Sequence, residues 1–132
     1  MGLRIVYIAL MGVILITYCI IADTKDKKHR MLGLASYYST KYEGRMCADN
    51  EHRFSNSKLY AAHCSLPFGT KVRVTNLKNG ERVIVTIVDR GPFNPGTHDP
   101  HNMRIIDLSQ KAARSLGMIQ AGVIEVKLEV IK

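Results

Sequence analysis

The sequence is short of cysteine and of acidic residues, and both shortages narrow its possible chemistry. Its 132 residues include only three cysteines, and their spacing contains no CxxC or zinc-ligand pattern. It also has no glycine-rich phosphate loop, no nucleophile elbow and no internal repeat. Eleven acidic residues against nineteen Lys and Arg leave a formal net charge of +8. Such a charge favours polyanionic partners such as nucleic acid, anionic lipid or cell-wall polymer, although it can also serve solubility alone.

A long uncharged, mostly apolar run occupies residues 5–22, and the polar run DTKDKKHR follows it at once. This pattern is typical of a secretory signal peptide or an uncleaved membrane anchor, and the abrupt charged boundary argues against a buried helix. The site after Ala22 satisfies only part of the small-residue rule for cleavage, and Tyr18 before Cys19 disfavours lipidation. We predict a signal peptide or membrane anchor over 1–22, a charged linker over 23–32 and one domain over 33–132. Export would remove nucleic acid from the possible partners.

Cys47 and Cys64 are the two cysteines of the predicted domain, and we assign both to structural roles. In an oxidising compartment they could form a disulfide, whose loop closure would stabilise the fold by about 3 kcal/mol. From the sequence alone, a Cys47–Cys64 disulfide and two free thiols are equally weighted alternatives.

Alternating hydrophobic residues predict a small all-β domain. The strand-like stretches are residues 34–39, 61–66, 71–76, 81–89, 104–108 and 121–131, and Asn79-Gly80 is a hairpin signal. A short helix over residues 110–116 is indicated by Ser109 as its cap and Gly117 as its end. Two long loops cover residues 42–57 and 91–103. We therefore predict a six-stranded β-barrel with one helix across an end.

Asp89 is the strongest candidate for chemistry, because it ends an apolar strand directly before Arg-Gly-Pro. Strict alternation places Asp89 on the same face as Val85 and Ile87, a setting that favours a neutral carboxyl able to act as a general acid. A structural aspartate that pairs with Arg90 or caps the following turn is an equally weighted alternative.

The other candidates are weaker on local sequence alone. Glu51 lies in a polar loop, and a His63 flanked by apolar residues is more often a hydrogen-bonded core residue. Asp107 precedes the predicted helix and is assigned a structural role through backbone N–H groups. His98, Asp99 and His101 share a Pro-rich loop without further ligands, so we predict no metal site.

Five motifs occur in a fixed order: LASYYS, EGRMCA, LYAAHCSLPFGTKVRVTNLKNG, VTIVDRGPF and RIIDLSQKAARSLGM. Through them, residues 33–132 resemble the rare lipoprotein A (RlpA) family of double-psi β-barrel proteins. The resemblance implies a six-stranded double-psi barrel with a glycan groove. It also implies lytic transglycosylase activity, in which peptidoglycan strands are cleaved without water to leave 1,6-anhydro ends.

The resemblance maps the family's catalytic residues onto Asp89, His63 and Glu51. It implies that Asp89 donates and then accepts a proton, that His63 orients it by hydrogen bonding, and that Glu51 stabilises positive charge on the sugar. The Glu51 loop departs from the family pattern, because Asn50 replaces a glycine and one extra residue precedes His63. We predict substrate binding by Tyr38, Arg90 and Phe93.

The implied setting is the periplasm or cell envelope, with peptidoglycan glycan strands as partner, no cofactor and a monomeric state. Residues 1–22 could add a membrane association. A non-catalytic cell-wall module of the expansin or barwin type is the alternative. The altered Glu51 loop favours that alternative, as does the lack of the C-terminal peptidoglycan-binding repeat that the family often carries.

Overall fold

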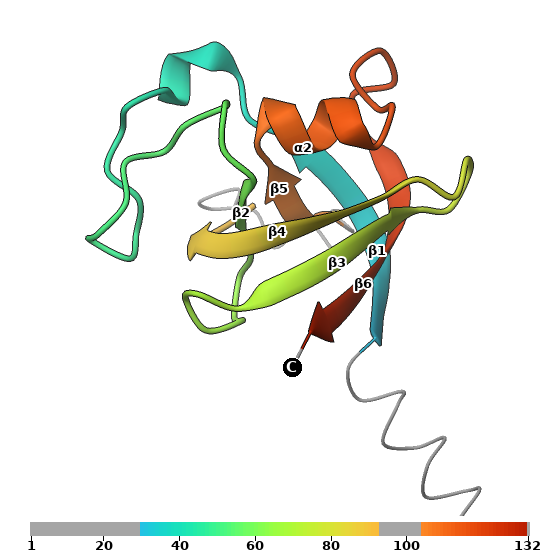
Figure 1. Cartoon of the computed structure of the whole chain (residues 1–132), viewed down its shortest axis with the longest axis horizontal. Helices are drawn as coiled ribbons and strands as arrows, with labels where there is room; N and C mark the ends of the chain where they lie inside the picture. The colour runs from blue at the N-terminus through green and yellow to red at the C-terminus, as the bar shows by residue number, and fades with distance from the viewer. Residues whose placement is uncertain (1–29, 93–103, 132) are drawn as a thin grey trace, which may run out of the picture. The chain divides into compact units, whose positions relative to one another are not determined.

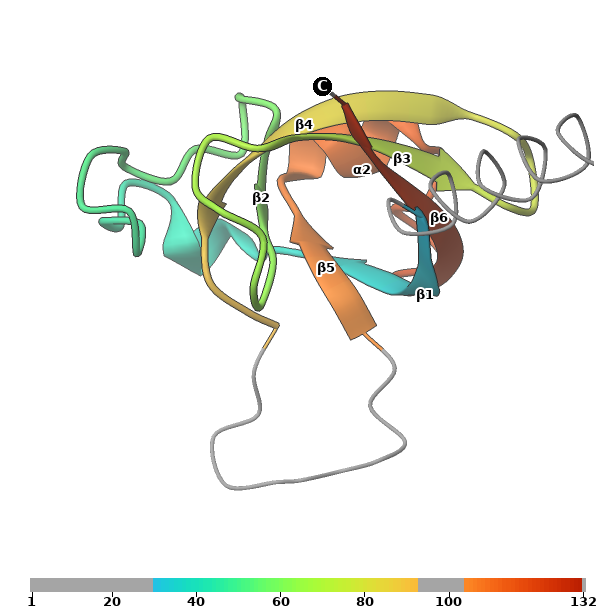
Figure 2. The same cartoon turned by 90° about the horizontal axis from the view of Figure 1, so that it is seen from below.

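The computed structural model describes residues 30–92 and 104–131, in which six strands close into a mixed barrel (Figures 1 and 2). The strands are β1 (Arg30–Tyr37), β2 (Tyr60–Ala62), β3 (Lys71–Asn76), β4 (Arg82–Asp89), β5 (Arg104–Leu108) and β6 (Ile124–Ile131). A 3₁₀ turn, η1 (Thr40–Tyr42), follows β1, and the α-helix α2 (Gln110–Ser115) lies between β5 and β6. The predicted signal or anchor segment lies outside the described residues. Within those residues, no helix is both long and apolar enough to cross a membrane.

The strand order around the barrel is β1-β5-β2-β4-β3-β6, which differs from the order along the chain. β1 pairs with β5 and β2 pairs with β4 in parallel, whereas β3 pairs with both β4 and β6 in antiparallel fashion. The predicted hairpin at Asn79-Gly80 is confirmed, because β3 and β4 are antiparallel neighbours on either side of it. The crossovers place β5 beside β1 and bring the end of β4 close to Tyr38, which follows β1, although these segments are far apart in sequence.

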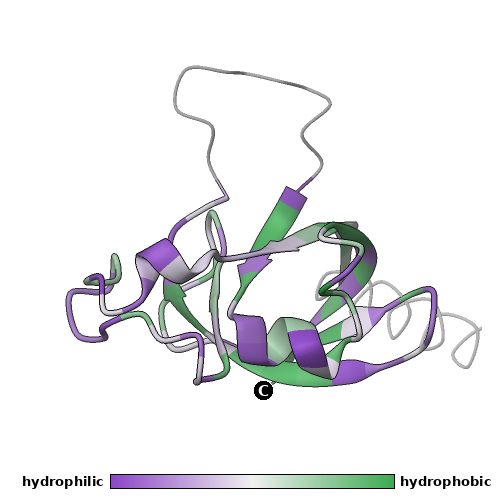
Figure 3. Cartoon of the chain, turned by 90° about the horizontal axis from the view of Figure 1, so that it is seen from above, coloured by the Kyte–Doolittle hydropathy of each residue, from purple (hydrophilic) through white to green (hydrophobic). Residues whose placement is uncertain are grey.

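The barrel core is built from the predicted alternation. Val72 and Val74 of β3, Val85 of β4, and Val126 and Leu128 of β6 are fully buried. The hydrophobic colouring of Figure 3 accordingly follows the strands, while α2 presents hydrophilic residues on part of its surface. Together these side chains form one continuous apolar cluster that supports the strand ends.

The helix α2 has the ends that the sequence predicts. The Ser109 hydroxyl accepts a hydrogen bond from the Ala112 N–H (3.3 Å) and donates one to the Lys58 carbonyl (2.6 Å). Gly117 then takes a φ of +65°, in the left-handed region that favours glycine. Ser109 therefore ties the helix to the chain just before β2.

A second apolar cluster holds the long loop of residues 42–57 against the barrel. Its buried members are Tyr38, Cys47, Phe54, Ala62 and Val88. The polar composition of residues 42–57 predicts a long loop, but it does not predict that Cys47 and Phe54 pack in a buried cluster. The structure also extends β1 to Arg30, so residues 30–32 of the predicted linker belong to the first strand.

Candidate functional site

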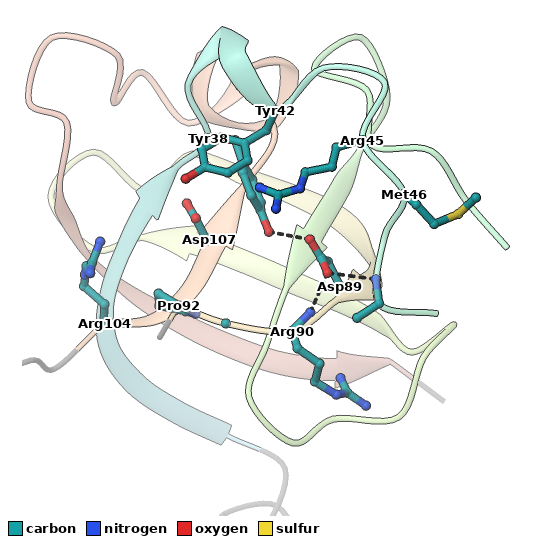
Figure 4. A pocket seen from close by; sticks show the side chains of 11 residues that line it. Tyr38, Tyr42, Arg45, Met46, Asp89, Arg90, Pro92, Arg104 and Asp107 are labelled. Atoms are coloured by element: carbon teal, nitrogen blue, oxygen red, sulfur yellow. Dashed lines mark hydrogen bonds between the residues drawn. The ribbon is translucent and has the colours of Figure 1, made fainter. Parts of the chain in front are cut away.

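A cavity of about 660 Å³ lies where the end of β4 meets β5 and the loop after η1 (Figure 4). Its lining among the described residues is mixed in charge and contains two carboxyl groups, Asp89 and Asp107. The other lining residues are Tyr38, Tyr42, Arg45, Met46, Ala48, Arg90, Gly91, Pro92 and Arg104. A concave, mostly preformed site with convergent polar groups is the usual form of a ligand site.

Asp89 reaches this cavity because the β2–β4 ladder is irregular at its end. Ala61 pairs with Ile87 but Ala62 pairs with Asp89, so an extra β4 residue, Val88, lies between them. A bulge of this kind breaks the alternation of side chains. The expectation that Asp89 shares the core face of Val85 and Ile87 is therefore wrong: its carboxylate contacts Tyr38 of the second cluster instead.

Three donors converge on the Asp89 carboxylate. The Tyr38 hydroxyl donates to Oδ2 (2.8 Å), and the backbone N–H groups of Ala48 and Arg90 each donate to Oδ1 (2.9 Å). Burial and the bond to Asp89 both raise the pKa of Tyr38, so its hydroxyl keeps the donated proton. Apolar surroundings were expected for Asp89, but the carboxylate has a polar, oriented environment.

Asp107 is the second carboxyl group of the cavity. It lies on β5, and its Oδ1 accepts a hydrogen bond from the Ser36 hydroxyl on β1 (3.3 Å). Burial raises the pKa of Asp107 to about 6, which the Ser36 bond and the Arg104 charge oppose and the Asp89 charge reinforces. The predicted bond to a backbone N–H is present, because the Leu108 N–H also lowers this pKa. The prediction nevertheless missed the position of Asp107 in the cavity, because local sequence does not reveal the β1–β5 pairing.

Two arginines line the same cavity and were not among the predicted site residues. The exposed Arg45 guanidinium lies 5.7 Å from the Tyr42 ring, and the Arg104 Nη1 donates to the Ser36 hydroxyl (3.4 Å). Each arginine stands in a motif of the resemblance, EGRMCA and RIIDLS, and these motifs were the available signal. Their charges suit a ligand with anionic or strongly polar groups.

His63 is buried next to the site but does not contact the Asp89 carboxylate. Its Nδ1 accepts hydrogen bonds from the backbone N–H groups of Ser65 and Leu66 (3.1 Å each), and its own backbone N–H donates to the Asp89 carbonyl (3.2 Å). Burial and the positive charge of Arg90 lower the pKa of His63. A neutral His63 thus shapes the turn after β2, and among the described residues its predicted hydrogen bond to the Asp89 carboxylate is not present.

Arg90 serves the same turn. Its Nη1 donates to the carbonyls of His63 (3.2 Å) and Leu66 (2.8 Å), and its guanidinium stacks 3.8 Å from the Phe68 ring centroid. Figure 4 shows this side chain extending away from Asp89. The predicted substrate contact of Arg90 therefore remains a prediction, and Phe93 lies outside the described residues.

Glu51 is exposed and is not part of the cavity lining among the described residues. Its loop is fixed by Asp49, whose Oδ1 accepts hydrogen bonds from the backbone N–H groups of Glu51 (3.0 Å) and His52 (2.9 Å). Asn50 adopts a φ of +59°, so it keeps the backbone conformation that favours glycine. Asn50 thus adopts a backbone conformation that a glycine at this position could also adopt, and the Glu51 side chain has no hydrogen-bond partner among the described residues.

Asp49, Glu51 and His52 could together offer ligand atoms to a metal, because one such atom from each lies within 4.8 Å of the others. The Asp49 Oδ2 already contacts the His52 Nδ1, and Oδ1 accepts the two backbone bonds. Although burial opposes it, these bonds lower the pKa of Asp49. The contacts of Asp49 and His52 in this group therefore stabilise the turn of the loop.

The two domain cysteines are free thiols in the structure, so no disulfide joins them. Cys47 is buried in the second cluster, where burial and the Asp89 charge raise its pKa to about 12. Cys64 is exposed in the turn after β2. Cys47 thus acts as a small core residue. Of the two alternatives left open by the sequence, a Cys47–Cys64 disulfide and two free thiols, the structure has the free thiols.

A family model described as lytic transglycolase matches residues 30–128, which include β1 to β5 and the first part of β6. The chain belongs to this family. The assignment agrees with the RlpA-like double-psi barrel that the sequence motifs predict.

Curated relatives are similar to this chain over about three quarters of its length. The chain is 52% identical over 101 residues to a probable endolytic peptidoglycan transglycosylase RlpA of Nostoc sp., covering 75% of this chain and 25% of the relative. It is 44% identical over 103 residues to the endolytic peptidoglycan transglycosylase RlpA of Pseudomonas aeruginosa, covering 78% and 28%. The chain thus spans less than half the length of these curated relatives.

Solved structures share the fold at lower identity. An apo expansin of Clavibacter michiganensis is 26% identical with a TM-score of 0.55, over 78% of this chain and 50% of that one. A Streptomyces papain inhibitor is 22% identical with a TM-score of 0.56, over 78% and 94%. The barrel fold alone is therefore compatible with proteins of different function.

Proposed function

We propose that this chain is a peptidoglycan lytic transglycosylase of the cell envelope that acts on glycan strands in the cavity around Asp89. The observation that carries the proposal is the oriented Asp89 carboxylate, held by Tyr38 and two backbone N–H groups at the edge of a 660 Å³ cavity. Family membership and the names of the curated relatives support the substrate class.

In the proposed reaction, the glycosidic oxygen between N-acetylmuramic acid and N-acetylglucosamine is protonated as its bond to the muramyl C1 breaks. The muramyl 6-hydroxyl attacks C1, and a carboxylate takes up its proton, which leaves a 1,6-anhydro end. Intramolecular attack removes the need for the water-sized gap between carboxylates of an inverting glycosidase. Asp89 is the proposed catalytic carboxyl, and no resident cofactor is required.

The remaining predicted residues take supporting parts in the proposal. His63 and Arg90 hold the turn after β2, whose backbone pairs with the end of β4 at Asp89. Glu51 keeps its predicted role in stabilising positive charge only if its loop moves toward the cavity when glycan binds. Export, a monomeric state and any membrane association through residues 1–22 belong to the same proposal.

The direct test is digestion of purified, peptide-free glycan strands, followed by mass spectrometry of the products. We expect anhydro-ended products from the wild type and at least a ~100-fold lower rate from Asp89→Asn. The matched control is Glu81→Gln, a change at an exposed acidic residue before β4 that is outside the cavity lining, and this variant should retain activity. Equal rates for Asp89→Asn and the wild type would contradict the assignment of Asp89.

The alternative function is glycan binding without cleavage, which the structural likeness to an expansin favours. Sedimentation of the protein with insoluble glycan separates the two functions. A binding module would co-sediment and release no anhydro ends, and Asp89→Asn would then change binding rather than product formation.

A further inference from the structure

The cavity contains a second carboxyl group that the proposed role of Asp89 leaves unused. Asp107 lies on β5 and lines the same cavity as Asp89, and both residues pair with Ala62 of β2, one on each side of that strand. Cleavage of a glycosidic bond needs one group that gives a proton and one that accepts a proton. A single carboxyl can do both in turn, but two carboxyls with different environments can divide these tasks.

The surroundings of Asp89 and Asp107 differ, as they must if one carboxyl is to accept a proton and the other to donate one. The Asp89 oxygens accept three hydrogen bonds, one each from Tyr38, Ala48 and Arg90, so this group is built as an acceptor. The Asp107 carboxyl accepts hydrogen bonds from the Ser36 hydroxyl and from the Leu108 backbone N–H, and its strand β5 pairs with β1 on one side and with β2 on the other. Burial disfavours the charged form of a carboxyl group.

The charged and titratable groups that face Asp107 come from three elements. Arg104 lies on β5 itself, Asp89 lies on β4, and Tyr38 follows β1. Arg104 favours the ionised carboxylate, whereas burial and the Asp89 charge favour the protonated acid, and the balance raises the pKa of Asp107 to about 6. Asp107 is thus protonated in mildly acidic solution while Asp89 accepts hydrogen bonds beside it.

We propose that Asp107 is a further catalytic residue, the proton donor to the glycosidic oxygen, and that Asp89 is the proton acceptor for the muramyl 6-hydroxyl. The assignment rests on the proposed function and divides its two proton transfers between two residues. The Asp107 proton passes to the glycosidic oxygen, and the electron pair of the broken C1–O bond stays on that oxygen. The 6-hydroxyl oxygen bonds to C1 and its proton passes to Asp89. Exchange with solvent then restores both carboxyls, and no water is consumed in the reaction.

The decisive experiment compares two substrates, because only a poor leaving group needs the proton. The first is peptide-free glycan, and the second is a GlcNAc-MurNAc disaccharide with a 2,4-dinitrophenyl group on the muramyl C1, which leaves unprotonated. We expect Asp107→Asn to lose about 10²- to 10⁴-fold in rate on glycan, the usual contribution of general acid catalysis. On the dinitrophenyl substrate it should stay within about tenfold of the wild type, whereas Asp89→Asn should be impaired on both substrates.

Each contrary result has a separate meaning. A folded Asp107→Asn that is equally impaired on both substrates would overturn the proton-donor role, as would full glycan activity in this variant. Rescue of Asp89→Asn by the dinitrophenyl group would assign the donor role to Asp89. A wild type that yields no anhydro ends from glycan would count against the proposed function itself.

A second measurement does not depend on how well Asp107→Asn folds. The glycan rate of the wild type should fall as the pH rises through about 6, where Asp107 loses its proton. Ser36→Ala removes a hydrogen bond that favours the charged form, so this fall should move to higher pH. A merely structural Asp107 predicts no movement, and an unchanged profile in a folded Ser36→Ala would overturn the proposal.

Discussion

At the scale of single residues, a small number of hydrogen-bond donors orients each carboxyl group of the cavity. Asp89 owes its orientation to one side-chain donor, Tyr38, and to two backbone donors that the loop and the turn supply. Tyr38 is itself fixed by ring contacts with Phe54 (4.1 Å) and Tyr42 (5.3 Å) between centroids. Substrate binding by Tyr38 stays a prediction, and the structure adds a second contact, in which the Tyr38 hydroxyl orients the Asp89 carboxylate.

Tyr38→Phe tests this positioning. The variant keeps the ring contacts and loses only the 2.8 Å hydrogen bond to Asp89. We expect a loss of about 0.5 to 1.5 kcal/mol in unfolding free energy and about a tenfold lower rate on glycan. Tyr37→Phe is the matched control, because it loses a 2.8 Å bond to the Ile119 carbonyl instead. Comparable rate losses in the two variants, measured by product release, would contradict the positioning role.

Asp107 should cost the protein stability at neutral pH. Its pKa rises from about 3.9 in an unfolded chain to about 6 in the fold, so the folded state binds the proton more tightly. The cost is absent below pH ~4 and grows as the pH rises to about 6. Asp107→Asn should therefore be about 1 to 3 kcal/mol more stable than the wild type at pH 7, with no difference near pH 4.

Urea unfolding at both pH values measures this difference. Asp49→Asn should change the free energy of unfolding in the opposite direction. Although burial opposes it, hydrogen bonds lower the pKa of Asp49, so its ionised form stabilises the fold. That variant should be less stable than the wild type at pH 7. A destabilised Asp107→Asn at pH 7 would show that the Asp107 carboxylate is a structural necessity rather than a burden.

At the scale of elements, sequence patterns predict the regular parts well. The alternation in residues 71–76 gives the bounds of β3, and Ser109 with Gly117 brackets α2. These predictions succeed because alternation and capping are local effects. Alternation fails at Asp89, where a bulge in the β2–β4 pairing adds a residue that only the partner strand reveals.

The loop of residues 42–57 provides a test at this scale. Asn50 has a φ of +59°, a region that Asn and Gly tolerate better than other residues. Asn50→Gly should change the unfolding free energy by no more than about 0.5 kcal/mol, whereas Asn50→Ala should cost about 1 kcal/mol. Chemical denaturation of both variants checks the order, and an alanine variant as stable as the wild type would contradict this backbone account.

At the scale of the whole molecule, barrel closure assembles the site from distant segments. Asp89 ends β4, Asp107 lies on β5, and Tyr38 follows β1. Motif resemblance predicts the fold and favours Asp89 as the catalytic carboxyl, whereas the position of Asp107 before the helix leads only to the prediction of a structural role. The cavity place of Asp107 follows from the parallel pairing of β5 with β1, a contact across 71 residues of sequence that local reasoning cannot supply.

The most direct test of the central claim is digestion of peptide-free glycan strands in water enriched in oxygen-18. A lytic transglycosylase uses the sugar's own 6-hydroxyl as the nucleophile, so its new anhydro ends should contain no heavy oxygen. We predict unlabelled 1,6-anhydro products by mass spectrometry and their loss in Asp89→Asn. Products that carry oxygen-18 at the cleaved end, or glycan that binds and remains uncut, would contradict the account.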